Sequence, residues 1–215
     1  MQLKRGVDMT ISQLQALLSS RTPAPMDRSA QFAVLVPLVE LDGELHLLYE
    51  VRAASLQRQP GEVCFPGGHM EAGETALACA LRETQEELAI PTDAVQVLGP
   101  LDFICHRSGF VLYPILALVD SSAVKNSVPN TAEVDRVMLV PVSELCRITP
   151  EEYRLELLPT PATNFPYERI GIPRDYPWNR GVDNGYIYPW PEKTIWGLTA
   201  RITRHVLTLL NTEGM

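Results

Sequence analysis

Three glutamates stand close together in the segment RETQEELAI. On an α-helix, residues three and four apart lie on one side, so Glu83, Glu86 and Glu87 fall within an arc of roughly 100°. Carboxylates crowded in this way repel one another, and hard divalent cations such as Mg²⁺ or Mn²⁺ relieve the repulsion. Cations held there would bridge a pyrophosphate and activate an attacking water. The alternative interpretation is a solvated helix face, since most runs of charge are solvated.

The residues around these glutamates favour the metal interpretation. Gly67 and Gly68 precede the helix and suit a tight turn that brings a backbone carbonyl close to the same metals. The segment GHMEAGETALACALRETQEELAI resembles the Nudix box, the signature of a pyrophosphohydrolase superfamily. The matching positions are Gly68, Glu74, Arg82, Glu83, Glu86 and Glu87. Two lesser positions depart from the pattern: Thr84 replaces an aliphatic residue, and Ala89 replaces a glycine at the helix end.

The resemblance implies metal-binding roles for the matched acids. Glu83, Glu86 and Glu87 would be the carboxylate ligands of the cations. One of them, or a metal-held water, would serve as the base. The carbonyl of Gly67 would complete a metal site. These assignments come from the resemblance, and they make Mg²⁺ or Mn²⁺ the expected cofactor.

The resemblance also implies supporting roles. Arg82 would orient the glutamates through charge-assisted hydrogen bonds. Glu74 would tie the loop to the helix. Glu133, in the segment PNTAEVDRVML, matches a position at which many Nudix enzymes carry another ligand or base. Its alternative is a solvated glutamate at the start of a strand.

The flanking sequence is similar to the coenzyme A pyrophosphatase branch of the superfamily. The segment LYEVRAASLQRQPGEVCFPGG carries its arginine, its glycine and its Phe-Pro-Gly-Gly motif, and IWGLTARI resembles the branch near the other end. Arg52 and Arg58 are candidate phosphate contacts or, alternatively, surface arginines; Phe65 and Gly68 are further candidates for substrate binding. The branch usually has arginine at position 57, histidine at 59 and Leu-Thr at 49–50, where this chain has Gln57, Gln59 and Tyr-Glu.

The expected reaction is attack of water on one phosphorus of a diphosphate, without a covalent enzyme intermediate. The expected substrate is coenzyme A or an acyl-CoA. Two alternatives stay open: a pyrophosphatase for ADP-ribose, a dinucleotide or another nucleotide, and a nucleotide-sensing module that does not cleave its ligand. The second alternative is the weaker one, because every glutamate of the box is present.

These residues need a mixed scaffold. Strand-like runs at 32–41 and 45–51 flank an Asp-Gly turn, three more runs follow the acidic helix at about 75–88, and VSELC indicates a short helix. A final helix is predicted at about 193–211, with Ile195 on its apolar face. The fold class is therefore α/β (α+β), and the resemblance implies a Nudix fold with a mixed β-sheet sandwiched between helices.

The chain is divided by its composition into unequal parts. Residues 1–29 are expected to hold a helix, from Thr10 to Ser19, and a linker. Residues 30–215 are expected to form one Nudix domain. Within it, about 150–192 is rich in Pro, Tyr, Asn and Trp without periodicity, which predicts a functional loop. Four of its aromatics are candidates for stacking on the ligand: Tyr176, Trp178, Tyr188 and Trp190. Trp190 has a core position as its alternative, and Trp196 is expected in the core.

Composition excludes some partners. The formal net charge of −8 argues against nucleic acid, and no long apolar run suggests a membrane span. The start MQLKRGVDMT has no hydrophobic signal core, so a cytoplasmic protein is expected. The scattered cysteines are expected to be reduced and structural: Cys64, Cys79, Cys105 and Cys146. A homodimer is a further expectation, from the Pro/aromatic segment.

Overall fold

The computed structural model describes residues 9–21, 25 and 30–211, and its first element is a short capped helix. Helix α1 (Ile11–Ser19) begins after Thr10, whose side chain accepts a hydrogen bond from the Gln13 N–H, while the Gln13 side chain accepts one from the Thr10 N–H. The reciprocal bonds satisfy two N–H groups at the helix end. They confirm the predicted helix and its cap. The predicted linker lies largely outside the described residues.

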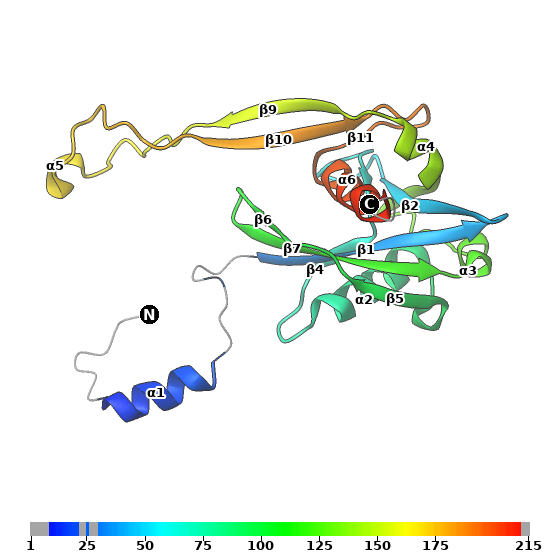
Figure 1. Cartoon of the computed structure of the whole chain (residues 1–215), viewed down its shortest axis with the longest axis horizontal. Helices are drawn as coiled ribbons and strands as arrows, with labels where there is room; N and C mark the ends of the chain where they lie inside the picture. The colour runs from blue at the N-terminus through cyan, green and yellow to red at the C-terminus, as the bar shows by residue number, and fades with distance from the viewer. Residues whose placement is uncertain (1–8, 22–24, 26–29, 212–215) are drawn as a thin grey trace.

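The main sheet carries the core of the molecule (Figure 1). Within the described residues it has eight strands: β1 (Ala30–Leu41), β2 (Glu44–Arg52), β3 (Val63–Cys64), β4 (Gly67–His69), β5 (Val95–Pro100), β6 (Ile104–His106), β7 (Phe110–Val119) and β8 (Val134–Pro141). Five strands follow the order β3-β2-β1-β7-β5. The other three pair with members of this series: β4 with β1, β6 with β7, and β8 with β2. Strands β1 and β7 are parallel and the other pairs are antiparallel, so the sheet is mixed, as predicted.

Helices cover both faces of this sheet (Figure 1). The larger ones are α2 (Ala76–Leu88) and α6 (Gly197–Leu210), and the shorter ones near the sheet are α3 (Ser121–Lys125), α4 (Val142–Arg147) and the 3₁₀ turn Thr92–Ala94. Helix α5 (Tyr167–Ile170) lies away from this sheet. One apolar cluster lies between α2 and the sheet, around Leu35 and Leu88. A second lies on the α6 side, around Tyr49 and Val206. Alternate residues of β1 and β2 point into opposite clusters, which is why these strands are almost continuously apolar.

The prediction of a loop at 150–192 is wrong for much of the segment. Strand β9 (Glu151–Leu157) pairs with β10 (Gly181–Tyr188) over seven residue pairs, and β10 pairs with β11 (Ile195–Trp196). We call the β9–β10 hairpin, residues 151–188, the arm; it projects beyond the domain and carries α5 near its distal end (Figure 1). The residues of β9 are exposed except for the partly buried Leu157, yet Tyr153, Leu155 and Leu157 alternate with polar residues. This short alternation was the available signal for a strand.

The end of the chain needs two corrections. The final helix begins at Gly197, because Ile195 and Trp196 pair with β10 as a short strand. Trp196 was expected in the core, yet 49% of its surface is exposed, since alternate strand residues face opposite sides and only Ile195 points inward. Tyr188 is buried, and Trp190 packs partly buried against the core.

Helical spacing predicts that Leu77, Ala80, Leu81, Thr84 and Leu88 share the buried side of α2. Ala80, Thr84 and Leu88 are buried, whereas Leu77 is 38% exposed and Leu81 is only partly buried, so the buried face is slightly rotated from the predicted one. Cys79 and Glu87 are buried in addition. The helix is turned toward β4 because Cys79 and Glu87 bond to the backbone of the glycine pair. The side that carries the glutamates is therefore half inside the protein.

The cysteines are all free, as predicted, but they are not all structural. Cys79 is buried and Cys64 is partly buried, whereas Cys105 and Cys146 are exposed. No helix among the described residues is long and apolar enough to cross a membrane.

Candidate active site

Two glycines allow the loop before α2 to approach its neighbours closely. Strand β4 pairs with β1, which sets Gly67 beside Val34 and Gly68 beside Ala33. A Cβ on Gly67 would lie 2.3 Å from the Ala33 carbonyl oxygen, and the residue adopts a φ of +152°. A Cβ on Gly68 would lie 2.4 Å from the Glu83 carboxylate. Only glycine at both positions lets the loop lie against the sheet and the acidic helix together.

Arg82 links this loop to the helix. Its Nε donates to Glu74 Oε1 at 3.0 Å and its Nη2 donates to Glu74 Oε2 at 3.2 Å, a two-point contact that fixes the plane of the guanidinium. The Glu71 N–H donates to the same carboxylate at 2.8 Å. The Arg82 hydrogen bonds, followed by that backbone bond, lower the pKa of Glu74. Glu74 therefore stays ionised and ties the loop to α2.

The same guanidinium holds two of the three crowded acids. Arg82 Nη1 donates to Glu83 Oε1 at 2.9 Å and to Glu86 Oε2 at 3.1 Å. Glu87 is held differently, since its Oε2 accepts a hydrogen bond of 2.8 Å from the Gly67 N–H. These are the contacts that the predicted positioning role of Arg82 requires. The catalytic roles themselves stay predictions.

Burial and like charge act against ionisation of these acids. Burial, together with the negative charges of Glu83 and Glu133, raises the pKa of Glu87 to about 8. The hydrogen bond from the Gly67 N–H acts in the opposite direction and lowers this pKa. Burial also raises the pKa of Glu83, although Arg82 opposes it. The cluster therefore lacks the positive charge that would keep all of its carboxylates ionised.

Most of the predicted site residues meet in one space, which we call the carboxylate cavity, of about 710 Å³. It is lined by residues that include Arg52, Arg58, Phe65, Gly67, Gly68, Glu83, Glu87 and Glu133. Glu133 arrives from a distant loop, because the Asn130 N–H donates to the Glu87 carbonyl at 2.7 Å and anchors that loop on the end of α2. Glu86 and Arg82 lie outside the lining, and Phe65 is mainly a core residue, stacked 4.8 Å from Tyr49.

Glu50 is the site residue that the sequence reading missed. It lies on β2, is 1% exposed, and its Oε1 has no hydrogen-bond partner in the described part of the chain. Burial, and then the charge of Glu87, raises the pKa of Glu50 well above its ordinary range. Arg52 lies two residues along the strand, on the same face, and its buried Nε is also unpartnered. A charged residue inside the apolar run LHLLYEV was the available signal.

The donor set fits hard divalent cations. No three His, Cys, Asp or Glu side chains among residues 9–21, 25 and 30–211 are arranged as a ready-made metal centre, because Arg82 and the Gly67 N–H occupy carboxylate oxygens. Carboxylate oxygens are nevertheless the preferred ligands of Mg²⁺ and Mn²⁺. The raised pKa values and the unpartnered Glu50 oxygen indicate a site short of positive charge.

Comparison with known proteins identifies the family. The NUDIX domain model matches residues 30–159, more than half of the chain. The chain belongs to the Nudix family. It is therefore a hydrolase of pyrophosphate bonds, and Nudix hydrolases generally use divalent cations. The predicted Nudix fold is confirmed.

Named relatives extend the match beyond the family model. Nudix hydrolase 3 of Caenorhabditis elegans is 30% identical over 206 residues, covering 94% of this chain and 82% of its own. The mitochondrial coenzyme A diphosphatase NUDT8 of Homo sapiens is 33% identical over 200 residues, covering 90% and 75%. The peroxisomal coenzyme A diphosphatase NUDT7 of Mus musculus is 38% identical over 115 residues, covering 53% and 48%. The resemblance to the coenzyme A branch is thus supported by relatives.

Proposed function

We propose that this Nudix hydrolase cleaves the diphosphate of coenzyme A or of an acyl-CoA. The observation that carries the proposal is the carboxylate cavity, in which Glu83, Glu87 and Glu133 line the same space as Arg52 and Arg58. Carboxylates for cations and guanidinium groups for a phosphate are the two requirements of diphosphate binding. The two relatives named as coenzyme A diphosphatases support the substrate class.

The proposed cofactor is Mg²⁺, with Mn²⁺ as a substitute. Glu83, Glu86 and Glu87, with the Gly67 carbonyl and Glu133, would hold it. When bound, the cations neutralise the diphosphate and lower the pKa of an attacking water. Arg82 then acts as a positioning residue, because it keeps Glu83 and Glu86 on one side of the helix.

In the proposed reaction, the oxygen of water forms a bond to one phosphorus while the bond from that phosphorus to the bridging oxygen breaks. The proton of the water passes to a carboxylate of the cluster, for which Glu83, Glu86, Glu87 and Glu133 are the candidates. Glu87 is the deeply buried member of this set, and its Oε2 is held by the Gly67 N–H. From coenzyme A the products would be adenosine 3′,5′-bisphosphate and 4′-phosphopantetheine.

A substrate panel tests the proposal. Coenzyme A, acetyl-CoA, ADP-ribose, NADH and diadenosine tetraphosphate are incubated with Mg²⁺ or Mn²⁺, and the products are separated by chromatography. We expect the highest kcat/KM for coenzyme A or acetyl-CoA and no product in the presence of a chelator. A higher kcat/KM for ADP-ribose or a dinucleotide would overturn the substrate class.

The remaining predictions belong to the same proposal. One Nudix domain over 30–215, a homodimer and a cytoplasmic location are proposed from the sequence. Light scattering after size-exclusion chromatography measures the oligomeric state. One of the two named coenzyme A diphosphatases is called peroxisomal and the other is called mitochondrial. Microscopy of the tagged protein therefore tests the proposed cytoplasmic location.

A further inference from the structure

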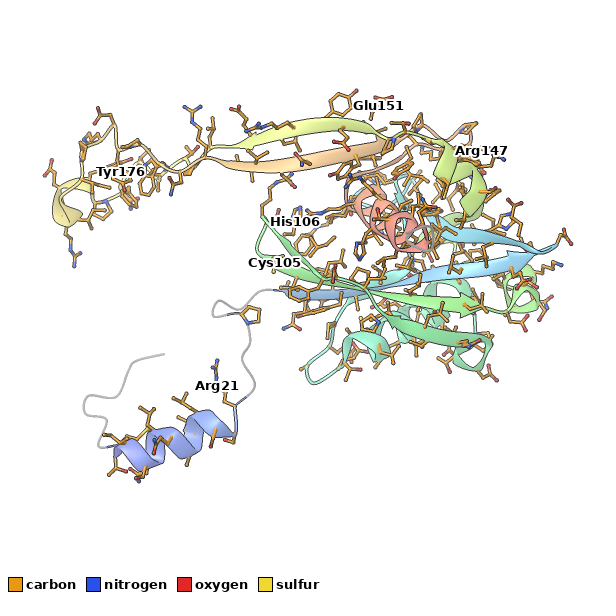
Figure 2. All side chains as sticks on the ribbon, in the orientation of Figure 1. Arg21, Cys105, His106, Arg147, Glu151 and Tyr176 are labelled. Atoms are coloured by element: carbon orange, nitrogen blue, oxygen red, sulfur yellow. The ribbon has the colours of Figure 1, made fainter. Side chains whose placement is uncertain are left out.

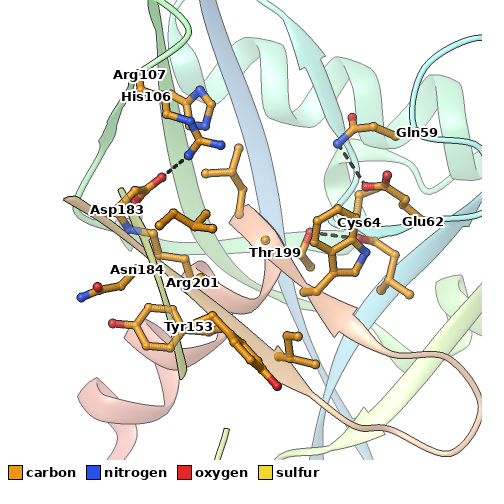
Figure 3. A pocket seen from close by; sticks show the side chains of 18 of the residues that line it. Gln59, Glu62, Cys64, His106, Arg107, Tyr153, Asp183, Asn184, Thr199 and Arg201 are labelled. Carbon is orange, nitrogen blue, oxygen red and sulfur yellow. Dashed lines mark hydrogen bonds and ion pairs between the residues drawn. The ribbon is translucent and has the colours of Figure 1, made fainter. Parts of the chain in front are cut away.

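A second cavity, of about 600 Å³, lies between the base of the arm and the domain (Figure 3). We call it the arm cavity. It adjoins the carboxylate cavity, because six residues line both: Arg52, Gln59, Cys64, Phe110, Leu198 and Thr199. A substrate whose diphosphate lies at the carboxylates would therefore extend into the arm cavity.

Two arginines meet one carboxylate in this second space. Asp183, on β10 of the arm, forms ion pairs with Arg107, after β6, and with Arg201 on α6, where the atoms Oδ1 and Nη1 are 3.6 Å apart. Figure 3 shows the Arg107 and Asp183 side chains pointing toward each other at one side of the cavity. Both arginine side chains remain nearly half exposed, at 44% and 47%. Each guanidinium therefore keeps N–H donors for a further acceptor.

The charges at this point do not cancel. Two guanidinium groups face one carboxylate, and His106 stands beside them in the cavity lining. Burial lowers the pKa of His106, and the positive charges of Arg107 and Arg201 lower it as well. The negative charge of Asp183 raises this pKa and so opposes them. The surplus positive charge favours an anion, and a phosphate monoester accepts the paired N–H groups of arginine particularly well.

Aromatic side chains complete the lining. Trp196 and Tyr153, on β11 and β9, are each about half exposed at 49% and 52%. His106 stacks on Phe110 with ring centroids 4.4 Å apart. Exposed ring faces next to arginines suit a nucleobase linked to a phosphate, since the base stacks while the phosphate is paired.

We propose that the arm cavity binds the nucleotide half of the substrate, and that Arg107 and Arg201 bind a phosphate monoester on its ribose in competition with Asp183. This inference rests on the proposed cleavage of a nucleoside-diphosphate-linked substrate, and it assigns the recognition of one half of that substrate to the arm. The distal aromatics are not part of this site: Tyr176 lies at the far end of the arm, away from His106 (Figure 2).

Nucleotide binding without hydrolysis tests the site. Calorimetry compares adenosine 3′,5′-bisphosphate, adenosine 2′,5′-bisphosphate and adenosine 5′-monophosphate on the full chain. We expect at least one bisphosphate to bind roughly tenfold or more tightly than the monophosphate, and the two isomers identify which ribose position is recognised. Arg107→Gln and Arg201→Gln should each weaken that bisphosphate about tenfold and change monophosphate binding less than about twofold. Arg147→Gln, an exposed ion-paired arginine on α4, is the matched control.

Asp183→Asn separates recognition from mere anchoring of the arm. If the ion pairs only hold the arm in place, Asp183→Asn must weaken every nucleotide, as the arginine variants would. If Arg107 and Arg201 bind phosphate, removal of the competing carboxylate must tighten the bisphosphate several-fold. Equal effects on mono- and bisphosphate, or no effect of any variant, would overturn the site. Coenzyme A hydrolysis is measured separately. If the protein prefers the bisphosphate to the monophosphate but does not hydrolyse coenzyme A, the proposed function is overturned. If it hydrolyses coenzyme A but does not prefer the bisphosphate, the arm site is overturned.

Discussion

The Nudix box and the arm are two regions of this molecule that organise polar residues in opposite ways. In the box, the contacts join residues that are close in the sequence: Arg82 bonds to Glu74, eight residues away, and the Gly67 N–H bonds to Glu87, twenty residues away. In the arm, Asp183 meets Arg107 across 76 residues. Most of the proposed cation ligands therefore come from one local segment, whereas the arm cavity is assembled from residues of β3, β6, β9, β10, β11 and α6, among others.

The two regions also differ in what stabilises them. The box confines like charges, and Arg82 and a backbone N–H offset part of their repulsion. The arm contains little buried apolar surface, and strand β9 is almost wholly solvated. A change in the box should therefore alter catalysis more than stability, and a change at the arm should alter recognition.

The largest effect is expected at the buried acid of the box. Glu87→Gln keeps the acceptor for the Gly67 N–H but removes the charge, so kcat should fall by at least about 100-fold, beyond the loss seen when only supporting groups of metal sites are changed. Because burial already disfavours the ionised form, the melting temperature should stay the same or rise. Glu71→Gln is the control, since Glu71 is exposed and joins the network through its backbone N–H. An active Glu87→Gln enzyme would contradict the assignment.

A smaller effect is expected from a methyl group in the loop. Gly68→Ala places a Cβ 2.4 Å from the Glu83 carboxylate, which Arg82 holds in position, so that carboxylate must move. We expect kcat to fall about 10–100-fold. A titration of activity with Mg²⁺ should also show a lower apparent affinity for the metal. Gly181→Ala, on the arm, adds a Cβ 3.3 Å from Leu157 and should leave kcat unchanged. Equal rates for the two variants would show that the loop does not position Glu83.

Glu50 offers a test of charge burial with a readout in stability. The pKa of Glu50 is raised in the folded protein, so protonated Glu50 favours folding at acidic pH. This contribution to the free energy of unfolding is lost as the pH rises through the pKa of the folded state. In a chelator, the free energy of unfolding of the wild type should fall with rising pH more steeply than that of Glu50→Gln. Denaturant titrations at several pH values measure the two slopes, and parallel slopes would mean that Glu50 is ionised throughout.

The smallest effect is expected at the distal end of the arm. Trp178 contacts Phe165 and Tyr176, with ring centroids 5.5 Å and 5.1 Å away, and none of these three lines either cavity. Trp178→Ser should change kcat/KM for coenzyme A by less than about twofold. Size-exclusion chromatography of the same variant reports whether this end of the arm supports the proposed homodimer. A large loss of kcat/KM would place the distal aromatics in the substrate site.

Much of the scaffold could be predicted because its signals are local. The turn at Asp42-Gly43, the strands around it and the cap of α1 follow from residue type and spacing. The strand β9 was missed although Tyr153, Leu155 and Leu157 alternate with polar residues, because that pattern is short and the pairing with β10 depends on residues some thirty positions away. Trp196 was misplaced for a related reason: its pairing with β10, which is distant from any local signal, puts it in a strand whose alternate residues face opposite sides.

By itself, the sequence determined the acidic helix and its glycine loop, because helical periodicity sets the side on which each of those residues lies. The resemblance of this segment to the Nudix box indicated the family. Only the tertiary structure decided that Glu50 and the Arg52 Nε lie buried near the glutamates of that helix, that Glu133 reaches the same cavity, and that Asp183 meets two arginines. These residues are brought together by strand pairing and by loop anchoring over long separations. No local preference of the chain encodes such distances, so the sequence alone could not supply them.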